Sequence, residues 1–223
     1  MNQDGMVDLS RPLGPDTQVY PGDPPVTFTP VATPAEDGCG ITAVSMSSQS
    51  GTHADAPRHF FAGGAGIDEL PLELFTGPAV VVDVTGRPDR CPIGWEDLAP
   101  READLGAGVV VLLRTGWSAH YGTPHYFAHP YLSGEAARRL VAAGVRTLGI
   151  DAPSPDVTPE PGREMPADGF AVHEAVLGAG GVIVENLCRL ELLDFAAPVF
   201  SALPIPLAGA DGAPVRAVAW PVR

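Results

Sequence analysis

Residues 49–60 combine side chains that bind metal ions with side chains that move protons. His53 and Asp55 are two positions apart, so in an extended segment both side chains project to the same side. Imidazole nitrogen and carboxylate oxygen are ligands that zinc and manganese accept. His59 follows the bend expected at Pro57, which lets its ring turn back toward the same point. The segment predicts a cation site; the alternative is a polar loop whose histidines make ordinary hydrogen bonds.

A second group lies more than a hundred residues further on. His173 is near the start of a predicted helix, and Glu185 ends the strand that follows. A carboxylate between apolar Val184 and Leu187 is costly to bury unless it is paired or bound to a metal. We therefore expect Glu185 to be a metal ligand, or else a capping or ion-paired carboxylate. Asp151 also ends a buried strand and is either a pocket wall or a turn-forming residue.

Residues 117–131 are rich in aromatic side chains and contain three of the six histidines, His120, His125 and His129. His125 and His129 have the spacing of one helical turn, but prolines bracket them and no carboxylate is close in sequence. This argues against a second metal site. We expect an aromatic lid over a flat substrate or an interface, with Trp117 as a candidate substrate contact.

The elements that must position these groups are short. Four apolar runs without alternation predict strands that are buried on both faces, at 79–84, 109–113, 147–150 and 182–184. Further strands are expected at 7–9, 26–29, 41–48 and 215–220, helices at 95–98, 133–143 and 170–177, and a proline-rich loop at 152–168. Strands followed by strand–helix–strand units predict one mixed α/β domain over residues 1–223.

Composition excludes several classes of protein. The chain has 223 residues, 45% of them hydrophobic, and a net charge of −14 with no lysine. Such acidity repels phosphate backbones and anionic lipid, so we expect a small-molecule substrate rather than nucleic acid or membrane. The apolar runs are too short to span a bilayer, and the first residues lack the pattern of a signal peptide. Three widely spaced cysteines suggest free thiols in the cytoplasm.

Residues 50–60, Ser-Gly-Thr-His-Ala-Asp-Ala-Pro-Arg-His-Phe, resemble the HxGTHxDxPxHF signature of the cyclase family, which includes bacterial kynurenine formamidases and isatin hydrolases. Further matches follow in order along almost the whole chain, at 8–10, 20–24, 149–151 with Ser154, His173 with 185–187, and 210–216. The resemblance implies a single α/β domain with a mixed sheet of the swivelling β/β/α type. It also implies a homodimer or higher homo-oligomer.

The resemblance further implies one or two divalent cations, zinc or manganese, per subunit. His53 would bind the first ion and His173 the second, while Asp55 and Glu185 would bridge both. The family's first signature histidine is replaced here by Gln49. An amide oxygen is a poorer zinc ligand than imidazole, so we expect a first site that is weakened, prefers manganese or is missing.

By the same resemblance His59 would donate and accept the proton, and Tyr20 would line the substrate pocket. The expected activity is metal-dependent hydrolysis of an amide, lactam or lactone carbonyl, as in an arylformamide, by metal-activated water. Two alternatives stay open. The same residues are suited to removing a proton from carbon and driving ring closure or dehydration in secondary metabolism. Gln49 is also consistent with an inert member that binds a ligand without turning it over.

Overall fold

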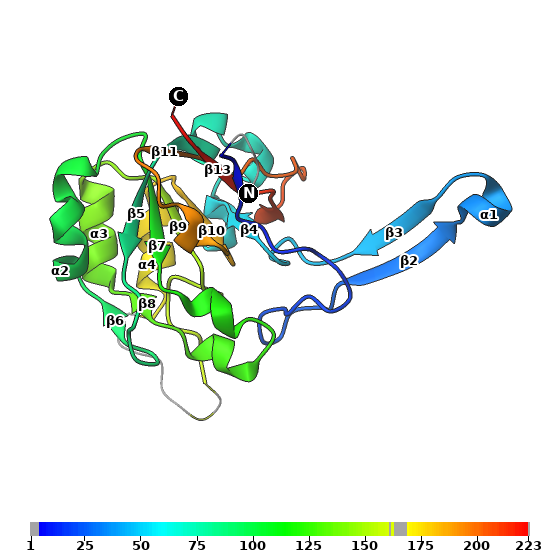
Figure 1. Cartoon of the computed structure of the whole chain (residues 1–223), viewed down its shortest axis with the longest axis horizontal. Coiled ribbons are helices and arrows are strands. Elements are labelled where there is room, and N and C mark those ends of the chain that lie inside the picture. Colours follow the sequence, from blue (N-terminus) through cyan, green and yellow to red (C-terminus); the bar gives the residue numbers. More distant parts are fainter. Residues whose placement is uncertain (1–4, 161, 163–168, 223) are drawn as a thin grey trace.

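A mixed sheet forms the centre of the computed structural model, which describes residues 5–160, 162 and 169–222 (Figure 1). Among these residues nine strands follow the order β1 (Val7–Asp8), β13 (Val218–Pro221), β11 (Pro198–Ser201), β5 (Thr76–Asp83), β7 (Val110–Arg114), β9 (Thr147–Ile150), β10 (Val182–Glu185), β4 (His53–Asp55) and β12 (Gly212–Pro214). Strands β5, β7, β9 and β10 are parallel, and the strands on either side pair antiparallel. The predicted α/β class with a mixed sheet is confirmed.

The four predicted buried strands are the four parallel strands, and both of their faces are covered. In β7, Val111 and Leu113 belong to one hydrophobic cluster, whereas Val110 and Leu112 belong to the other. All four side chains are exposed by 1% or less. Because neither face meets water, the strand needs no polar alternation, which explains why these segments read as continuous apolar runs.

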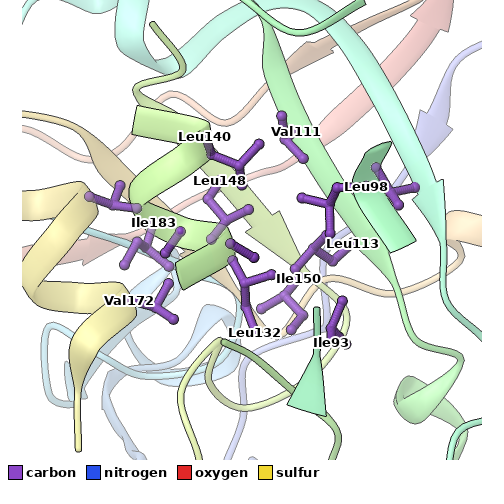
Figure 2. Packing of buried hydrophobic residues seen from close by; sticks show 14 of the residues in the cluster. Ile93, Leu98, Val111, Leu113, Leu132, Leu140, Leu148, Ile150, Val172 and Ile183 are labelled. Atoms are coloured by element: carbon purple, nitrogen blue, oxygen red, sulfur yellow. The ribbon is translucent and has the colours of Figure 1, made fainter. Parts of the chain in front are cut away.

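Helices α2 (Trp95–Leu98), α3 (Gly134–Ala142) and α4 (Ala171–Gly178) supply the cover on one face. Figure 2 shows Leu140 of α3 and Val172 of α4 beside Leu148 and Ile183 of the sheet. Burying each such side chain contributes roughly 1.5–3 kcal/mol relative to its exposed state. The predicted N-cap of α3 is confirmed, because the Ser133 side chain accepts a hydrogen bond from the backbone N–H of Ala136.

The sheet curls because its two ends are tied together by one short connection. Strand β12 lies at one end of the sheet order and β13 next to the other end. Only residues 215–217 separate these strands in sequence, which spans little more than ten ångströms even when extended. The face inside this curl holds the second hydrophobic cluster, which includes Leu9, Phe75 and Phe200.

A hairpin projects from the body of the molecule (Figure 1). It consists of β2 (Thr27–Ala32), the short helix α1 (Pro34–Asp37) and β3 (Ile41–Ser45), and β2 and β3 pair only with each other among the described strands. The sequence predicts a strand over 41–48, but β3 ends at Ser45. The chain then bends through a turn at 48–52 before it enters β4.

The remaining described elements are small. Strands β6 (Pro92–Ile93) and β8 (Tyr131–Leu132) form a two-stranded parallel pair. Residues 152–160 are neither helix nor strand, as predicted, whereas 161 and 163–168 of the expected proline-rich loop lie outside the described residues. Within the described part of the chain, every helix is too short or too polar to cross a bilayer.

Candidate metal centre

Strands β4 and β10 and helix α4 bring the four candidate ligands to one place. The antiparallel register of β4 and β10 sets His53 directly opposite Glu185. Asp55 follows on β4, and His173 projects from the first turn of α4. Each of the four side chains is buried, with an exposed fraction of 6% or less. His53 and Asp55, two residues apart on β4, and His173 and Glu185, twelve residues apart on α4 and β10, thus form a single cluster.

The two carboxylates lie between the two imidazoles. His53 Nε2 is 3.4 Å from Asp55 Oδ1 and 3.4 Å from Glu185 Oε2. His173 Nε2 is 3.6 Å from Asp55 Oδ2 and 3.4 Å from Glu185 Oε1. Each carboxylate therefore turns one oxygen toward each histidine. Ligand atoms of His53, Asp55 and Glu185 all lie within 4.8 Å of one another, which is a separation that one cation can bridge.

Backbone and side-chain acceptors set the tautomers of both histidines. His53 Nδ1 is 2.9 Å from the carbonyl oxygen of Gly51, and His173 Nδ1 is 2.6 Å from Asp156 Oδ2. Both partners are acceptors, so each Nδ1 carries the proton and donates it. In the neutral rings Nε2 then keeps its lone pair, directed at the carboxylates, which is how metal-binding histidines are held in proteins.

Several oxygens of the cluster lack a hydrogen-bond donor. Among the described residues, nothing donates to Asp55 Oδ1, Asp55 Oδ2 or Glu185 Oε1. Burial alone would raise the pKa of Asp55, but His53 and His173 beside it hold this pKa well below its usual range. Burial alone would lower the pKa of His53, but Asp55 and Glu185 raise it well above the usual value. The cluster favours positive charge and has free oxygen ligands, so its residues fit a divalent cation.

Asp156 is a functional residue that sequence reasoning missed. Its carboxylate accepts the backbone N–H groups of Val172 at 2.9 Å and of His173 at 3.0 Å, as well as the His173 ring. It thereby caps the N-terminus of α4 from outside the helix. Phe170 occupies the N-cap position and has no side-chain acceptor, which was the one signal that a distant carboxylate must do this.

His59 and Gln49 lie beside the cluster and share a partner. His59 Nδ1 and Gln49 Nε2 are each 3.0 Å from Asp211 Oδ2. The His59 ring centre is 5.9 Å from that of His173, so the proposed proton carrier is close to the candidate ligands. Burial lowers the pKa of His59, but the hydrogen bond to Asp211 and the charge of Asp55 outweigh it and raise this pKa.

A cavity of about 290 Å³ opens onto the cluster. His53, His173 and Glu185 form part of its lining, together with His59 and Gln49. The aromatic part of the wall comprises Tyr20, Phe60, Tyr126, Phe127 and Phe170, and polar positions are Gln18, Asp23, Ser154 and Asn186. Such a cavity suits a flat ring placed next to a cation.

Aromatic contacts hold this wall in place. Tyr20 meets Phe127 edge to face at 6.0 Å, and Phe60 stacks on His173 at 4.6 Å between ring centres. Asn186 has a left-handed φ of 57° and accepts the Tyr126 hydroxyl at 3.0 Å. Asn adopts this left-handed conformation more readily than most residues. The hydrogen bond from Tyr126 connects Asn186, directly after β10, to the cavity wall. Sequence reasoning did not assign this role to Asn186.

Asp151 and Trp117, predicted as substrate contacts, are absent from the described cavity lining. Asp151 is 1% exposed, and its carboxylate accepts the backbone N–H groups of Thr115 and Gly116 at 2.7 and 2.9 Å. Its oxygens are thus used to join the ends of β7 and β9. The Trp117 indole donates to the carbonyl oxygen of Tyr126 at 3.0 Å and so lies behind the wall. Both residues support the cavity from outside.

The histidine-rich loop divides into two parts. The rings of Trp117, His120 and His125 pack against one another, with centres 4.6–5.2 Å apart. His129 is separate and buried, with Nδ1 at 2.9 Å from the Pro130 carbonyl oxygen and Nε2 at 2.8 Å from Thr158 Oγ1. The metal-ligand geometry that the structure describes lies elsewhere, at His53, Asp55 and Glu185.

Two imidazoles and two bridging carboxylates at the base of an aromatic cavity define a metal-dependent enzyme of small molecules. Comparison with known proteins agrees. The family model described as "Putative cyclase" matches residues 7–157. Kynurenine formamidase of Bacillus cytotoxicus is 34% identical over 219 residues, which cover 97% of each chain.

Two solved structures extend the likeness to three dimensions. Isatin hydrolase A from Labrenzia aggregata, bound to benzyl benzoate, has a TM-score of 0.86 at 26% identity and covers 98% of this chain and 94% of its own. A potential metal-dependent hydrolase with cyclase activity has a TM-score of 0.76 at 28% identity and covers 98% of both chains. The chain belongs to the cyclase family. It is a metal-dependent hydrolase similar to kynurenine formamidases and isatin hydrolases.

Proposed function

We propose that the protein hydrolyses the carbonyl–nitrogen bond of a small aromatic amide, an arylformamide in the first instance. The observation that carries this proposal is the position of His53, His173 and Glu185 in the lining of an aromatic cavity. Tyr20 and Phe127 on the cavity wall suit an aryl ring, and the buried cluster suits a carbonyl that needs polarisation. The resemblance to kynurenine formamidases supports the same substrate class.

The cation is proposed to be zinc or manganese, with room for two positions. A cation beside His173 would be held by that imidazole together with Asp55 and Glu185, whose oxygens lie 3.6 and 3.4 Å from His173 Nε2. The position beside His53 has the other oxygen of each carboxylate, and Gln49 as a weak additional ligand. An amide oxygen suits manganese better than zinc, so we propose weaker occupancy on the His53 side.

When bound, the cation lowers the pKa of a water molecule and polarises the substrate carbonyl. The chain's own residues then have to hold the ring and move one proton. The aromatic wall holds the aryl ring, and Asp55 and Glu185 balance the positive charge. His59 Nε2 accepts the proton of the attacking water and passes it to the leaving nitrogen, a transfer that suits an imidazole at neutral pH.

A substrate panel tests the proposal. The protein, loaded with manganese or zinc, is assayed with N-formylkynurenine, with isatin as a lactam and with an aryl lactone. We expect the fastest turnover with the formamide, and a loss of about 10²–10⁴-fold in kcat for His59→Gln. Turnover of the lactam alone would shift the substrate class, and inertness toward all three would leave a binding protein.

We propose that two copies of the chain associate through the β2–β3 hairpin. Every residue of β3 is exposed, and Phe28 faces Val44 across the strands although these side chains are 40% and 50% exposed. A hairpin with two strands and no packed face is marginally stable by itself. A second copy of this chain would cover these apolar side chains by packing against the β2–β3 hairpin.

Three finer assignments are also proposals. The fold is placed in the swivelling β/β/α type, which is supported by the mixed sheet and its helical layer. We propose a single domain over residues 1–223, which is supported by the pairing of β1 near the start with β13 near the end. A cytoplasmic location is supported by three free cysteines, of which Cys39 is exposed.

A further inference from the structure

Asp211 is placed rigidly beside the candidate active site. It directly precedes β12, whose first residue, Gly212, pairs with Asp55 of β4. The Asp211 backbone carbonyl accepts the N–H of Ala56 at 2.9 Å. A Cβ atom at position 212 would lie 2.7 Å from the Ala54 carbonyl oxygen and 2.8 Å from Gln49 Nε2. Only glycine permits this close approach, so the position of the Asp211 carboxylate is set by the backbone of the metal-bearing strand.

Three donors converge on this carboxylate. Ser48 Oγ donates to Oδ1 at 2.7 Å. Gln49 Nε2 and His59 Nδ1 both donate to Oδ2, each at 3.0 Å. The two nitrogens are 3.3 Å apart, but both direct N–H groups at the same oxygen and therefore do not bond to each other.

An ionised carboxylate only accepts hydrogen bonds, and this decides the state of both partners. His59 must carry its proton on Nδ1, which leaves the lone pair of the neutral ring on Nε2. Gln49 must present its NH₂ group to Asp211, so its Oε1 points away from this carboxylate. That oxygen is buried and accepts no hydrogen bond from the described residues. His59 and Gln49 both line the cavity, whereas Asp211 does not.

We propose that Asp211 is a positioning residue that sets the His59 tautomer and the Gln49 amide orientation together. This proposal rests on the proposed function, amide hydrolysis, in which His59 carries one proton. His59 Nε2 takes one proton from water and delivers it to the leaving nitrogen, while the Nδ1 proton stays on the His59 ring and is donated to Asp211 throughout. The acid and amine products contain the atoms of the amide and one water, and no proton is gained or lost.

The variant Asp211→Asn tests the role at nearly constant shape. Its amide offers one neutral oxygen in place of a carboxylate, so the His59 Nδ1–H and the Gln49 amide lose the charged acceptor that holds both. We expect kcat to fall by about 10²–10⁴-fold, as when a carboxylate that orients a catalytic imidazole becomes an amide. KM should change less than about threefold, because Asp211 does not line the cavity. Bound metal should fall far less than kcat, because Asp211 holds only Gln49, the weakest of the proposed ligands. Asp211→Glu, which keeps the carboxylate, should recover part of kcat.

The matched control is Asp8→Asn. Asp8 is likewise a carboxylate that accepts side-chain hydrogen bonds, in this case two from Arg216, but it is absent from the cavity lining. Its kcat should equal that of the unmodified protein. Full kcat in Asp211→Asn, or a parallel loss of metal and activity, would overturn the positioning role.

A second readout needs no activity. Nitrogen-15 NMR of the imidazole rings, with His59→Gln to identify the resonances, reports which ring nitrogen carries the proton. We expect the Nδ1–H form of His59 in the unmodified protein and a smaller fraction of it in Asp211→Asn, whose neutral oxygen is a weaker acceptor. The Nε2–H form in the unmodified protein would overturn the inference even if Asp211→Asn fails to fold. Absence of hydrolysis by the unmodified protein would instead count against the proposed function and leave this NMR result to decide the tautomer.

Discussion

At the residue scale, the carboxylates of Asp55 and Glu185 each contact both His53 and His173. Each carboxylate directs one oxygen to His53 and the other to His173, at 3.4–3.6 Å. Bridging of this kind needs both carboxylates ionised. The pKa of Asp55 is held low by the neighbouring imidazoles despite its burial, which agrees with that requirement.

Replacing Asp55 by Ala removes one ligand from each proposed cation position. We expect bound metal to fall below about a tenth of the unmodified level and turnover to be lost. Metal analysis of the purified protein, paired with an activity assay, measures both. Asp16→Ala, at an exposed turn, should change neither quantity. An Asp55→Ala protein with full activity would rule out the scheme.

Asp156 acts on the metal through His173. In Asp156→Asn one oxygen remains to cap α4, but the charge that holds the His173 Nδ1–H at 2.6 Å is gone. We expect metal affinity to fall by about 10–100-fold with the fold retained. Competition with a chelator of known affinity measures this change, and Asp16→Asn is the control. Unchanged affinity would mean that Asp156 serves only the helix terminus.

His129 predicts a pH dependence of stability. Its burial lowers its pKa to about 4, against about 6.5 in the unfolded chain. Between these values the unfolded chain takes up a proton that the folded protein does not, so stability falls as pH falls. From about pH 7.5 to about pH 5 this linkage costs about 2 kcal/mol.

Urea unfolding of the unmodified protein and of His129→Gln measures this effect at both pH values. Other titrating groups are common to the two proteins, so their contributions largely cancel in the difference. The unmodified protein should lose about 2 kcal/mol more than the variant on acidification. Equal losses would show that His129 is protonated in the folded state.

Side-chain spacing in the sequence was enough to nominate His53, Asp55, His173 and Glu185, which the structure brings together. It was not enough to find Asp156 or the role of Asp211. Both carboxylates act on histidines more than fifteen residues away, and such contacts depend on how strands and loops meet. Backbone N–H groups use the oxygens of Asp151, which is another contact that its place at the end of a predicted strand does not reveal.

At the element scale, the parallel strands were predictable, and so were strands near β2 and β3, but the ends of these two strands and their pairing as a hairpin were not. A strand buried on both faces needs an apolar run, and 147–150 matches β9 at both ends. The end of β3 at Ser45 depends on its pairing with β2, and nothing in the apolar and β-branched pattern of 41–48 marks this end. The projection of the hairpin is a property of the assembled molecule rather than of its own residues.

The hairpin is the element that tests self-association. Phe28→Ser combined with Val44→Ser removes the facing apolar pair from the exposed strands. We expect the proposed dimer to dissociate at least about tenfold more readily, measured by analytical ultracentrifugation over a concentration series. Thr42→Ser, on the same hairpin, should leave the dimer intact. A monomeric unmodified protein would contradict the assignment.

At the scale of the whole molecule, the curl of the sheet joins distant parts of the chain around the site. Strand β12 from the C-terminal region lies against β4, and through Asp211 it reaches His59. The N-terminal region contributes Tyr20 to the same cavity. A mixed α/β class follows from the order of predicted elements, but this curl follows only from the positions of β12 at one end of the sheet and of β13 next to the other end.

The central claim is that catalysis depends on a cation held by the buried cluster. The most direct measurement is hydrolysis of N-formylkynurenine by the purified protein before and after removal of metal with a chelator, followed by addition of manganese or zinc. We expect activity to be lost with the metal and to return on its addition, in proportion to the metal bound. Hydrolysis that continues at full rate in the metal-free protein would contradict it.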